Sequence, residues 1–375
     1  MPTLRILHVI ADLGTYGAQR LLGLLLNAFD EPDQSVAVMT IYSSPQAAAS
    51  LQVPVLDVAR RGRYDLAFLP RMIGLMRGWR PDVVHTHMHN GKYWGRIAAL
   101  ASGVPTIVHT EHNSEFGAPR AFRPLNRLLL PRTDAVVAFS PTQRDRLCAD
   151  ERIPRDRVAV IPNGLALASP DPAARARARA IFAAGDEPVI VHVGRLAAVK
   201  NQRLAIEALL FLPPPARLVL IGEGPDRAML AEHAVRYGVA ERVTFLGFRD
   251  DAAALVAGAD VALLTSLNEA MPMVAIEAMI AGAPLVSAPW LGAHELLGDG
   301  RFGLVSADYS PAAVAAAVAQ VLTDPAGARA RAAAAETFAR EEYAIETTAR
   351  RYAALYRTLS VGRRPASPAI TAARS

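Results

Sequence analysis

The chain has a single cysteine, Cys148, among its 375 residues. One cysteine excludes an internal disulfide framework and fits a reducing compartment such as the cytosol. No motif surrounds Cys148, so we interpret it as an inert, partly buried thiol and not as a nucleophile. The chain also lacks any apolar run close to the roughly 20 residues of a membrane span. These absences predict a cytoplasmic protein.

Two sequence patterns are missing from places where they would be informative. No D-x-D occurs, so the usual carboxylate pair for a divalent cation is absent and we expect no metal cofactor. The segment MPTLRILHVIADLG has an apolar run that is too short for a signal peptide, and we expect it to form a first strand. The turn after this strand lacks the full G-x-G-x-x-G fingerprint of dinucleotide-binding folds.

The net charge of +5 is modest but unevenly distributed. Residues 60–80 carry six arginines against one acid, and residues 120–132 carry four arginines and no acid. Both stretches mix arginine with large apolar residues, as does a helix that rests on an anionic membrane surface. The solvated face of an amphipathic core helix explains the pattern equally well. Nucleic acid is a less favoured partner, because no recognised binding motif accompanies the charge.

Apolar segments with the length of strands alternate with helical segments, which predicts an α/β fold with parallel sheets. The strand candidates of the first half are LRILHVI (4–10), SVAVMTI (35–41), DVVH (82–85), TIVHT (106–110), DAVVAFS (134–140) and RVAVI (157–161). Those of the second half are PVIVHVG (188–194), RLVLIG (217–222), RVTFLG (242–247), DVALLT (260–265) and PLVS (284–287). Both halves therefore resemble doubly wound sheets with a cleft between them.

The chain is long enough for two domains of ordinary size. We expect an N-terminal domain over residues 1–165 and a C-terminal domain over 188–342. Between them, residues 166–187 are rich in proline and small residues and predict a linker with some helix. An amphipathic terminal helix is expected over 343–359. Residues 360–375 contain too few apolar side chains to pack and predict a disordered tail.

Two glutamates eight residues apart, Glu269 and Glu277, are the most informative feature of the chain. Glu269 follows the strand candidate VALLT, and Pro272 occupies the expected start of a helix, where a missing N–H is tolerated. The free N–H groups of Met273 and Val274, with the helix dipole, can hold a phosphate. Ionised carboxylates accept hydrogen bonds only and suit sugar or ribose hydroxyls. A solvated acidic helix edge is disfavoured, because the apolar run AMIAGAP follows Glu277.

Two cations lie just beyond another strand candidate, in the segment VGRLAAVKNQ. The guanidinium of Arg195 and the ammonium of Lys200 can together neutralise a diphosphate leaving group without a metal. Two ordinary surface cations are the alternative. The segment ADLGTYGAQR supplies Gly14 and Gly17 at the first strand-to-helix turn, where glycine lets the backbone approach a ligand closely. A glycine that only serves helix packing is the alternative there.

Two groups of histidines follow strand candidates of the first half. His85, His87 and His89 form an H-x-H-x-H run that could suggest zinc, but we expect a strand to splay them to opposite faces. His112 follows the strand TIVHT and is expected to face the cleft. There its imidazole could hydrogen-bond a ligand and stabilise developing charge. A purely structural His112 remains the alternative.

Together these residues resemble the signature of retaining nucleotide-sugar glycosyltransferases of family 4, which have the GT-B fold of two Rossmann-like domains. The resemblance covers about residues 4–357. It includes the G-R-L-x-x-x-K element around Arg195, the G-x-G-P turn at Gly222 and the T-x-H position of His112, although Asn113 stands where the family has an acid. It also implies that the terminal helix packs back on the N-terminal domain.

The resemblance implies that Glu269 contacts the donor sugar and that Glu277 holds the ribose. It implies a catalytic set of His112, Glu269, Arg195 and Lys200. It implies a nucleotide-sugar site formed by Gly17, Arg195, Lys200, Gly222, Glu269, Ala270, Met271, Met273, Val274 and Glu277.

The resemblance therefore predicts a metal-independent, retaining glycosyltransferase with a UDP- or GDP-sugar donor and a lipid-linked or glycan acceptor. The arginine-rich stretches favour a lipid-linked or growing polysaccharide acceptor and contact with an anionic membrane at its inner face. One alternative is another GT-B nucleotide-sugar enzyme, such as an epimerase or a soluble disaccharide synthase. A second is a non-catalytic assembly subunit, which the presence of Arg195, Lys200, Glu269 and Glu277 disfavours.

Overall fold

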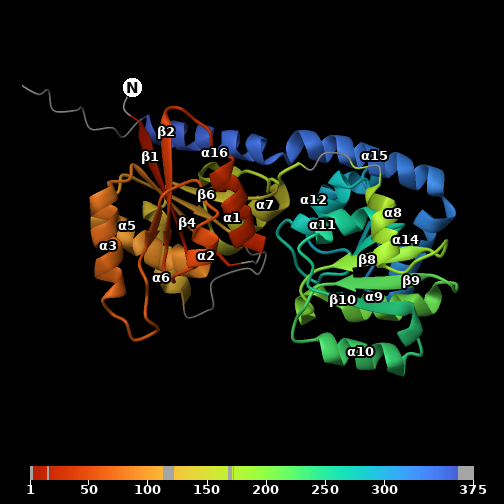
Figure 1. Cartoon of the computed structure of the whole chain (residues 1–375). Helices are drawn as coiled ribbons and strands as arrows, with labels where there is room; N and C mark the ends of the chain where they lie inside the picture. The colour runs from red at the N-terminus through yellow and green to blue at the C-terminus, as the bar shows by residue number, and fades with distance from the viewer. Residues whose placement is uncertain (1–2, 15–16, 113–121, 168–170, 172, 362–375) are drawn as a thin grey trace, which may run out of the picture.

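The computed structural model describes residues 3–14, 17–112, 122–167, 171 and 173–361. It has two lobes side by side, with two long helices near the carboxyl terminus running along one edge of both (Figure 1). We call the lobes the N-domain and the C-domain. The expected tail lies outside the described residues from position 362 onward.

Seven parallel strands in the order β3-β2-β1-β4-β5-β6-β7 form the sheet of the N-domain. They are β1 Leu4–Ile10, β2 Gln34–Thr40, β3 Val55–Asp57, β4 Val83–His87, β5 Thr106–Thr110, β6 Ala135–Ala138 and β7 Val158–Val160. Strands β4, β5 and β6 are buried along their whole length, as expected of parallel strands covered on both faces. The strand order reverses between β1 and β4, which makes the crevice at their carboxyl ends the expected ligand site.

Seven helices belong to the described part of the N-domain. They are α1 Gly17–Asn27, α2 Pro45–Ala48, α3 Phe68–Trp79, α4 Met88–Asn90, α5 Arg96–Ser102, α6 Arg123–Leu129 and α7 Pro141–Glu151. A π-helical turn, Gly91–Gly95, joins α4 to α5. Ser140 caps α7 by accepting a hydrogen bond from the Gln143 N–H, and proline at the first turn favours the start of this helix.

The C-domain repeats the architecture with six parallel strands in the order β10-β9-β8-β11-β12-β13. They are β8 Val189–Val193, β9 Arg217–Ile221, β10 Val243–Gly247, β11 Val261–Leu264, β12 Leu285–Ser287 and β13 Leu304–Val305. Its helices are α8 Ala174–Ile181, α9 Gln202–Ala208, α10 Arg227–Arg236, α11 Ala252–Leu255, α12 Met273–Ile280, α13 Ala293–Leu296 and α14 Pro311–Thr323. Here the strand order reverses between β8 and β11, so that the loops after these two strands border the second crevice.

The predicted α/β class with two parallel, doubly wound sheets is confirmed. Every strand candidate from the sequence overlaps a strand of the structure. The sequence did not reveal β3 and β13, which have three and two residues. Helix α8 lies within the expected linker, and its Ala178 joins Phe182 in the C-domain core.

The last two helices are α15 Pro325–Glu342 and α16 Ile345–Ser360. Ala335 and Ala339 of α15 belong to the C-domain core. Tyr352 and Tyr356 of α16 belong to the core between α1 and the N-domain sheet. The chain therefore crosses from the C-domain back to the N-domain through these helices, as Figure 1 shows along the upper edge.

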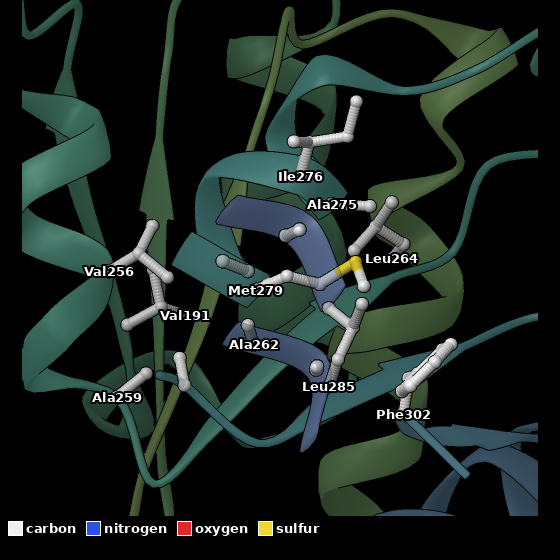
Figure 2. Close-up of a cluster of buried hydrophobic side chains, with 14 of the residues drawn as sticks. Val191, Val256, Ala259, Ala262, Leu264, Ala275, Ile276, Met279, Leu285 and Phe302 are labelled. Carbon is white, nitrogen blue, oxygen red and sulfur yellow. The ribbon is translucent and has the colours of Figure 1, made fainter. Parts of the chain in front are cut away.

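Helix α12 is the central helix of the C-domain core. Ile276 and Met279 are fully buried against strand residues that include Leu264 and Leu285 (Figure 2). The same helix carries Glu277, which is 8% exposed. Burial of the residues 275–279 thus fixes the position of α12 in the core.

Replacing Met279 with alanine is expected to destabilise the protein by about 2–5 kcal/mol, because it leaves a cavity in a fully buried core. Denaturant unfolding would measure the change. Met229, which is 39% exposed on α10, provides a matched control. Its alanine variant should differ from wild type by about 0.5 kcal/mol at most. Equal effects of both substitutions would contradict the central role of α12.

Candidate active site between the two sheets

The residues expected from the sequence gather at the carboxyl edges of the two sheets. In the N-domain, Gly17 begins the helix after β1 and His112 follows β5. In the C-domain, Lys200 follows β8 and Glu269 follows β11. Because β8 and β11 flank the point at which the strand order reverses, their loops meet at the expected ligand crevice.

Lys200 and Glu269 form an ion pair. Lys200 Nζ donates to Glu269 Oε1 at 2.5 Å, and the side chains are only 22% and 13% exposed. A partly buried pair is screened less by solvent than a surface pair, so the ammonium is held in a defined place. The structure therefore brings together a cation and a carboxylate that lie 69 residues apart in the sequence.

Two further hydrogen bonds hold the Lys200 turn against the Glu269 loop. Thr265 Oγ1 donates to the Lys200 carbonyl at 2.9 Å, and the Leu267 N–H donates to the Val199 carbonyl at 2.9 Å. Gln202 also donates from Nε2 to the Arg195 carbonyl at 2.9 Å, which fixes the same turn from its other end. The Arg195 side chain is exposed at the edge of this turn.

Gly222 makes a close backbone approach possible. It has a φ of +142°, and a Cβ placed on it would lie 2.1 Å from the Gly194 carbonyl oxygen. The turn after β9 can therefore pack directly on the turn after β8 only with glycine at this position. The structure places Gly222 as a support of the Arg195–Lys200 turn.

The amino-terminal ends of α1 and α12 face one another across the domains. A Cβ placed on Gly17 would lie 3.9 Å from Met273 Sδ. Met273 and Val274 begin α12 directly after Pro272, as the sequence predicted. Two helix amino termini that converge present positive dipole ends and N–H groups to the same space, which favours an anion there.

Glu277 is joined to the N-domain by an ion pair that the sequence did not indicate. Arg20 Nη1 lies 3.3 Å from Glu277 Oε1, with the arginine 53% exposed and the glutamate 8% exposed. Burial raises the pKa of Glu277, and the Arg20 charge opposes that rise. Arg20 therefore favours the ionised carboxylate, which is the form that accepts hydrogen bonds at both oxygens.

Asn163 makes a second contact between the domains. Its Nδ2 donates to the Met271 carbonyl at 3.0 Å, and its side chain is 5% exposed. A third contact joins the Thr142 N–H at the start of α7 to Glu295 Oε2 at 2.9 Å. The loop with Ala270 and Met271 is thus held in part by the N-domain.

A cleft of about 420 Å³ opens beside the Arg20–Glu277 pair. Its N-domain wall is formed by α1 and by residues 50–51. The C-domain contributes Phe248, Arg249 and Asp250 from the segment after β10. Phe248 is 62% exposed although it is aromatic, so its ring is accessible to a flat ligand.

His112 is held by another histidine. Its Nε2 lies 3.0 Å from His87 Nδ1, and its ring meets Phe139 edge-on at 5.4 Å. Burial lowers the pKa of His112 to about 4, so its imidazole is neutral at pH 7. A neutral ring can exchange hydrogen bonds with a hydroxyl, but it carries no positive charge. The expected role of His112 in hydrogen-bonding a ligand and stabilising developing charge stays a prediction, because a neutral ring can still stabilise charge through a hydrogen bond.

The expectation that the strand splays His85 and His87 to opposite faces is wrong. His85 and His87 lie two residues apart in β4 and so share a face, with ring centroids 4.3 Å apart. With His8 they form a buried group whose ring nitrogens lie within 4.8 Å of one another. His8 Nδ1 and His87 Nε2 are only 2.9 Å apart and bond to each other. We interpret the group as hydrogen-bonded histidines and not as a metal site.

The sequence analysis did not assign a role to Arg20 or Asn163. Arg20 lies within ADLGTYGAQR, and Asn163 follows the strand candidate RVAVI. Their partners, Glu277 and Met271, belong to the other domain, more than 100 residues away. The only local feature that could have pointed to Arg20 is its positive charge one turn into α1.

Comparison with known proteins shows the family to which the chain belongs. The model of the glycosyl transferases group 1 family matches residues 175–338, and that of glycosyltransferase family 4 matches residues 16–169. Together they span most of the chain. The chain therefore belongs to the group 1 glycosyltransferases, which depend on nucleotide sugars.

Among characterised relatives, the chain is similar to the glycogen synthase of Mycobacterium tuberculosis (strain ATCC 25618 / H37Rv), with 32% identity over 80% of this chain and 74% of that protein. It is 28% identical to the 2-deoxystreptamine glucosyltransferase of Streptomyces kanamyceticus, over 76% of this chain and 79% of that one. The solved structure of Anabaena Alr3699/HepE in complex with UDP and glucose has a TM-score of 0.84 at 21% identity, covering 95% of this chain and all of that chain. This likeness establishes the GT-B fold.

Proposed function

We propose that this glycosyltransferase moves a sugar from a UDP- or GDP-sugar to a hydroxyl of a lipid-linked or glycan acceptor, with retention of the anomeric configuration. One observation carries the proposal. The Lys200–Glu269 pair and the amino terminus of α12 lie on one side of a crevice whose other side begins with Gly17. The Anabaena structure, which holds UDP and glucose in the same fold, supports a uridine nucleotide.

The diphosphate is assigned to the positive groups of the C-domain crevice. Lys200 and Arg195 follow β8, and the first N–H groups of α12 at Met273 and Val274 lie at the same edge of the sheet. Two cations with a helix dipole can stabilise the charge that develops on a leaving diphosphate. We therefore propose that no divalent metal is needed.

The nucleoside and the sugar are assigned to the two glutamates. Glu277, whose ionised form Arg20 favours, accepts hydrogen bonds from the ribose hydroxyls, and Phe248 provides a surface for the base. Glu269 orients the donor sugar, while His112 contacts a hydroxyl from the N-domain side. We propose a front-face displacement in which the leaving phosphate accepts the proton of the acceptor. Closure of the domains would exclude water and limit donor hydrolysis.

Sugar transfer in the presence of EDTA tests this proposal. UDP-, GDP- and ADP-sugars would be offered with a panel of glycan and lipid-linked acceptors, and the anomeric proton of the product would be followed by NMR. We expect transfer with retention and no requirement for metal. Inversion would contradict the front-face step, and activity that returns only with a divalent ion would contradict metal independence.

Arg20 gives a test of the ribose assignment by pH. Arg20→Ala is expected to raise the pKa of Glu277 further, because only the burial effect remains. The ionised glutamate needed for nucleotide binding would then disappear at a higher pH, so the acidic limb of the binding curve for UDP should move upward. Titrations of wild type and variant between pH 4 and 8 would show this. An unchanged limb would mean that Glu277 does not control binding.

We also propose that the protein contacts an anionic membrane at the inner face of the cytoplasmic membrane. This proposal is based on exposed side chains of the N-domain. Helix α3 packs Phe68 and Met76 inward, so its apolar face is not free. The segment before it exposes Tyr64 at 79% and Leu66 at 83%, next to Arg63 in the sequence. Of the helices in the described part of the chain, none has both the length and the apolar character that spanning a bilayer requires.

Flotation with vesicles tests the membrane contact. Wild type should float with vesicles that contain anionic lipid and not with neutral ones, because arginines near the surface add electrostatic attraction. The double variant Tyr64→Ser and Leu66→Ser should bind less. Equal binding to both kinds of vesicle, or no binding, would remove this part of the proposal.

A further inference from the structure

A path of hydrogen-bonded, buried side chains runs inward from His112. His112 Nε2 lies 3.0 Å from His87 Nδ1, and His87 Nε2 lies 2.9 Å from His8 Nδ1. His8 and His87 are 0% and 2% exposed. Strands β1, β4 and β5 are neighbours in the sheet, which is why histidines from distant parts of the sequence meet here.

The path continues to α16, the last helix in the described part of the protein. The Tyr356 hydroxyl of α16 lies 3.5 Å from His8 Nε2 and 2.6 Å from His85 Nδ1. His85 Nε2 then lies 2.7 Å from Thr110 Oγ1, which is 3.3 Å from the Tyr352 hydroxyl. A continuous hydrogen-bonded path thus connects the crevice to α16.

Every ring on this path is uncharged at neutral pH. Burial lowers the pKa of His8 to about 3 and those of His85 and His87 well below their usual range. Burial also raises the pKa of Tyr352 to about 12 and that of Tyr356 well above 10. A neutral imidazole has one N–H and one bare nitrogen. In a row of such rings, all donors must therefore point the same way along the row.

The short contact of Tyr356 selects the direction. His85 contacts two hydroxyl groups at similar distances, Tyr356 at 2.6 Å and Thr110 at 2.7 Å, and a neutral ring can accept from only one of them. The phenol of Tyr356 is the more acidic hydroxyl and makes the shorter contact, so it is the donor, and His85 donates from Nε2 to Thr110. Tyr356 therefore donates to His85 Nδ1, and its oxygen can accept only from His8 Nε2. His8 Nδ1 is then bare and accepts from His87 Nε2. His87 Nδ1 is bare in turn and accepts from His112 Nε2.

We propose that Tyr356, acting through His8 and His87, holds His112 in the tautomer that has its proton on Nε2. Because His87 engages Nε2, the bare Nδ1 of the partly exposed ring remains to accept a hydrogen bond from a substrate hydroxyl. Tyr356, His8 and His87 are positioning residues, and the terminal helix contributes to the site through them. The inference rests on the proposed function only for the identity of the hydroxyl.

The location of His112 links this tautomer to the donor side. Asn163 lines the same small cavity as His112, between α1 and α16, and it also donates to the Met271 carbonyl of the donor loop. Asn163 therefore connects the cavity at His112 to the loop that carries Glu269.

NMR of protein labelled with ¹⁵N in its histidines reads the tautomer directly, without any activity measurement. The chain has nine histidines, and His112→Asn identifies the signal of interest. In wild type we expect a protonated Nε2 and a bare Nδ1 at His112. Tyr356→Phe keeps the buried ring but removes the hydroxyl, so neither direction of the row is favoured and the Nδ1–H form should become populated.

Tyr352→Phe is the matched control, because it removes a hydroxyl from the same helix beyond Thr110 and outside the row that leads to His112. The His112 tautomer should not change in this variant. A wild-type His112 with its proton on Nδ1 would overturn the inference. So would a Tyr356→Phe protein in which His112 remains entirely in the Nε2–H form.

Kinetics separate positioning from folding. Tyr356→Phe should lower kcat by about tenfold, as expected for weakening of one hydrogen bond. Its Kd for UDP should equal that of wild type, because the contacts of Tyr356 are with residues that are not assigned to the nucleotide, such as His8 and His85. A fall in UDP affinity with an unchanged tautomer would indicate structural damage and overturn the inference. A wild-type protein that binds no nucleotide, yet shows the expected tautomers, would instead contradict the proposed function.

Discussion

Replacing Lys200 with alanine is expected to lower kcat for sugar transfer by about 1,000-fold, at the upper end of what one preorganised charge supplies. The Lys200 ammonium pairs with Glu269, and we propose that it stabilises the charge that develops on the leaving diphosphate. Because that charge is larger in the transition state than in the bound donor, kcat should fall more than the KM for the donor rises. Steady-state kinetics at saturating acceptor would measure both.

Arg203 provides the control for Lys200. It lies one turn further along the chain in α9, is 56% exposed and pairs only at 4.0 Å with Glu207. Arg203→Ala should leave kcat within about twofold of wild type, as expected for an exposed pair of little energetic value. A Lys200→Ala enzyme that keeps more than a tenth of the wild-type kcat would reduce Lys200 to a structural partner of Glu269.

Replacing Glu277 with alanine is expected to weaken UDP binding by about 100-fold, because hydrogen bonds to a charged group contribute about 1.5–3 kcal/mol each. The loss should not come from unfolding. Burial raises the pKa of Glu277, so the folded protein holds this carboxylate at a cost. The partner left behind, Arg20, is 53% exposed and can return to water. Calorimetry would give the Kd, and a thermal melt would show a midpoint that is not lowered.

Glu232 on α10 is a suitable control, since it is an exposed glutamate of the same domain. Its alanine variant should bind UDP as wild type does. Should Glu277→Ala bind UDP within threefold of wild type, the ribose assignment would be wrong, whatever the fate of Lys200. Comparing the two variants therefore separates the nucleoside part of the site from the diphosphate part.

The local part of the site could be predicted from the sequence. Glu269, Pro272 and Glu277 lie within nine residues of one another, and the strand before them and the helix that carries Glu277 follow from apolar patterning. Lys200 is likewise placed by the strand that precedes it. In a parallel sheet the carboxyl ends of such strands meet at one edge, so a correct reading of strands is enough to bring these groups together.

The contacts between the domains could not be predicted in this way. The pairing of Arg20 with Glu277 depends on how the two lobes meet, and no local pattern records that. The path from His112 to Tyr356 depends on the strand order β1-β4-β5 and on the return of α16 to the N-domain. Strand β13 has only two residues, too few to show a periodicity.

The most direct test of the account is calorimetric titration of the wild-type protein with UDP, GDP and ADP in EDTA. We expect one of these nucleotides to bind at one site per chain without metal, and we expect Glu277→Ala to weaken this binding. In a thermal melt, a ligand at 100 times its Kd should add about 2.7 kcal/mol of stability. If none of the three nucleotides binds, the crevice formed by Lys200, Glu269 and Glu277 is not a donor site.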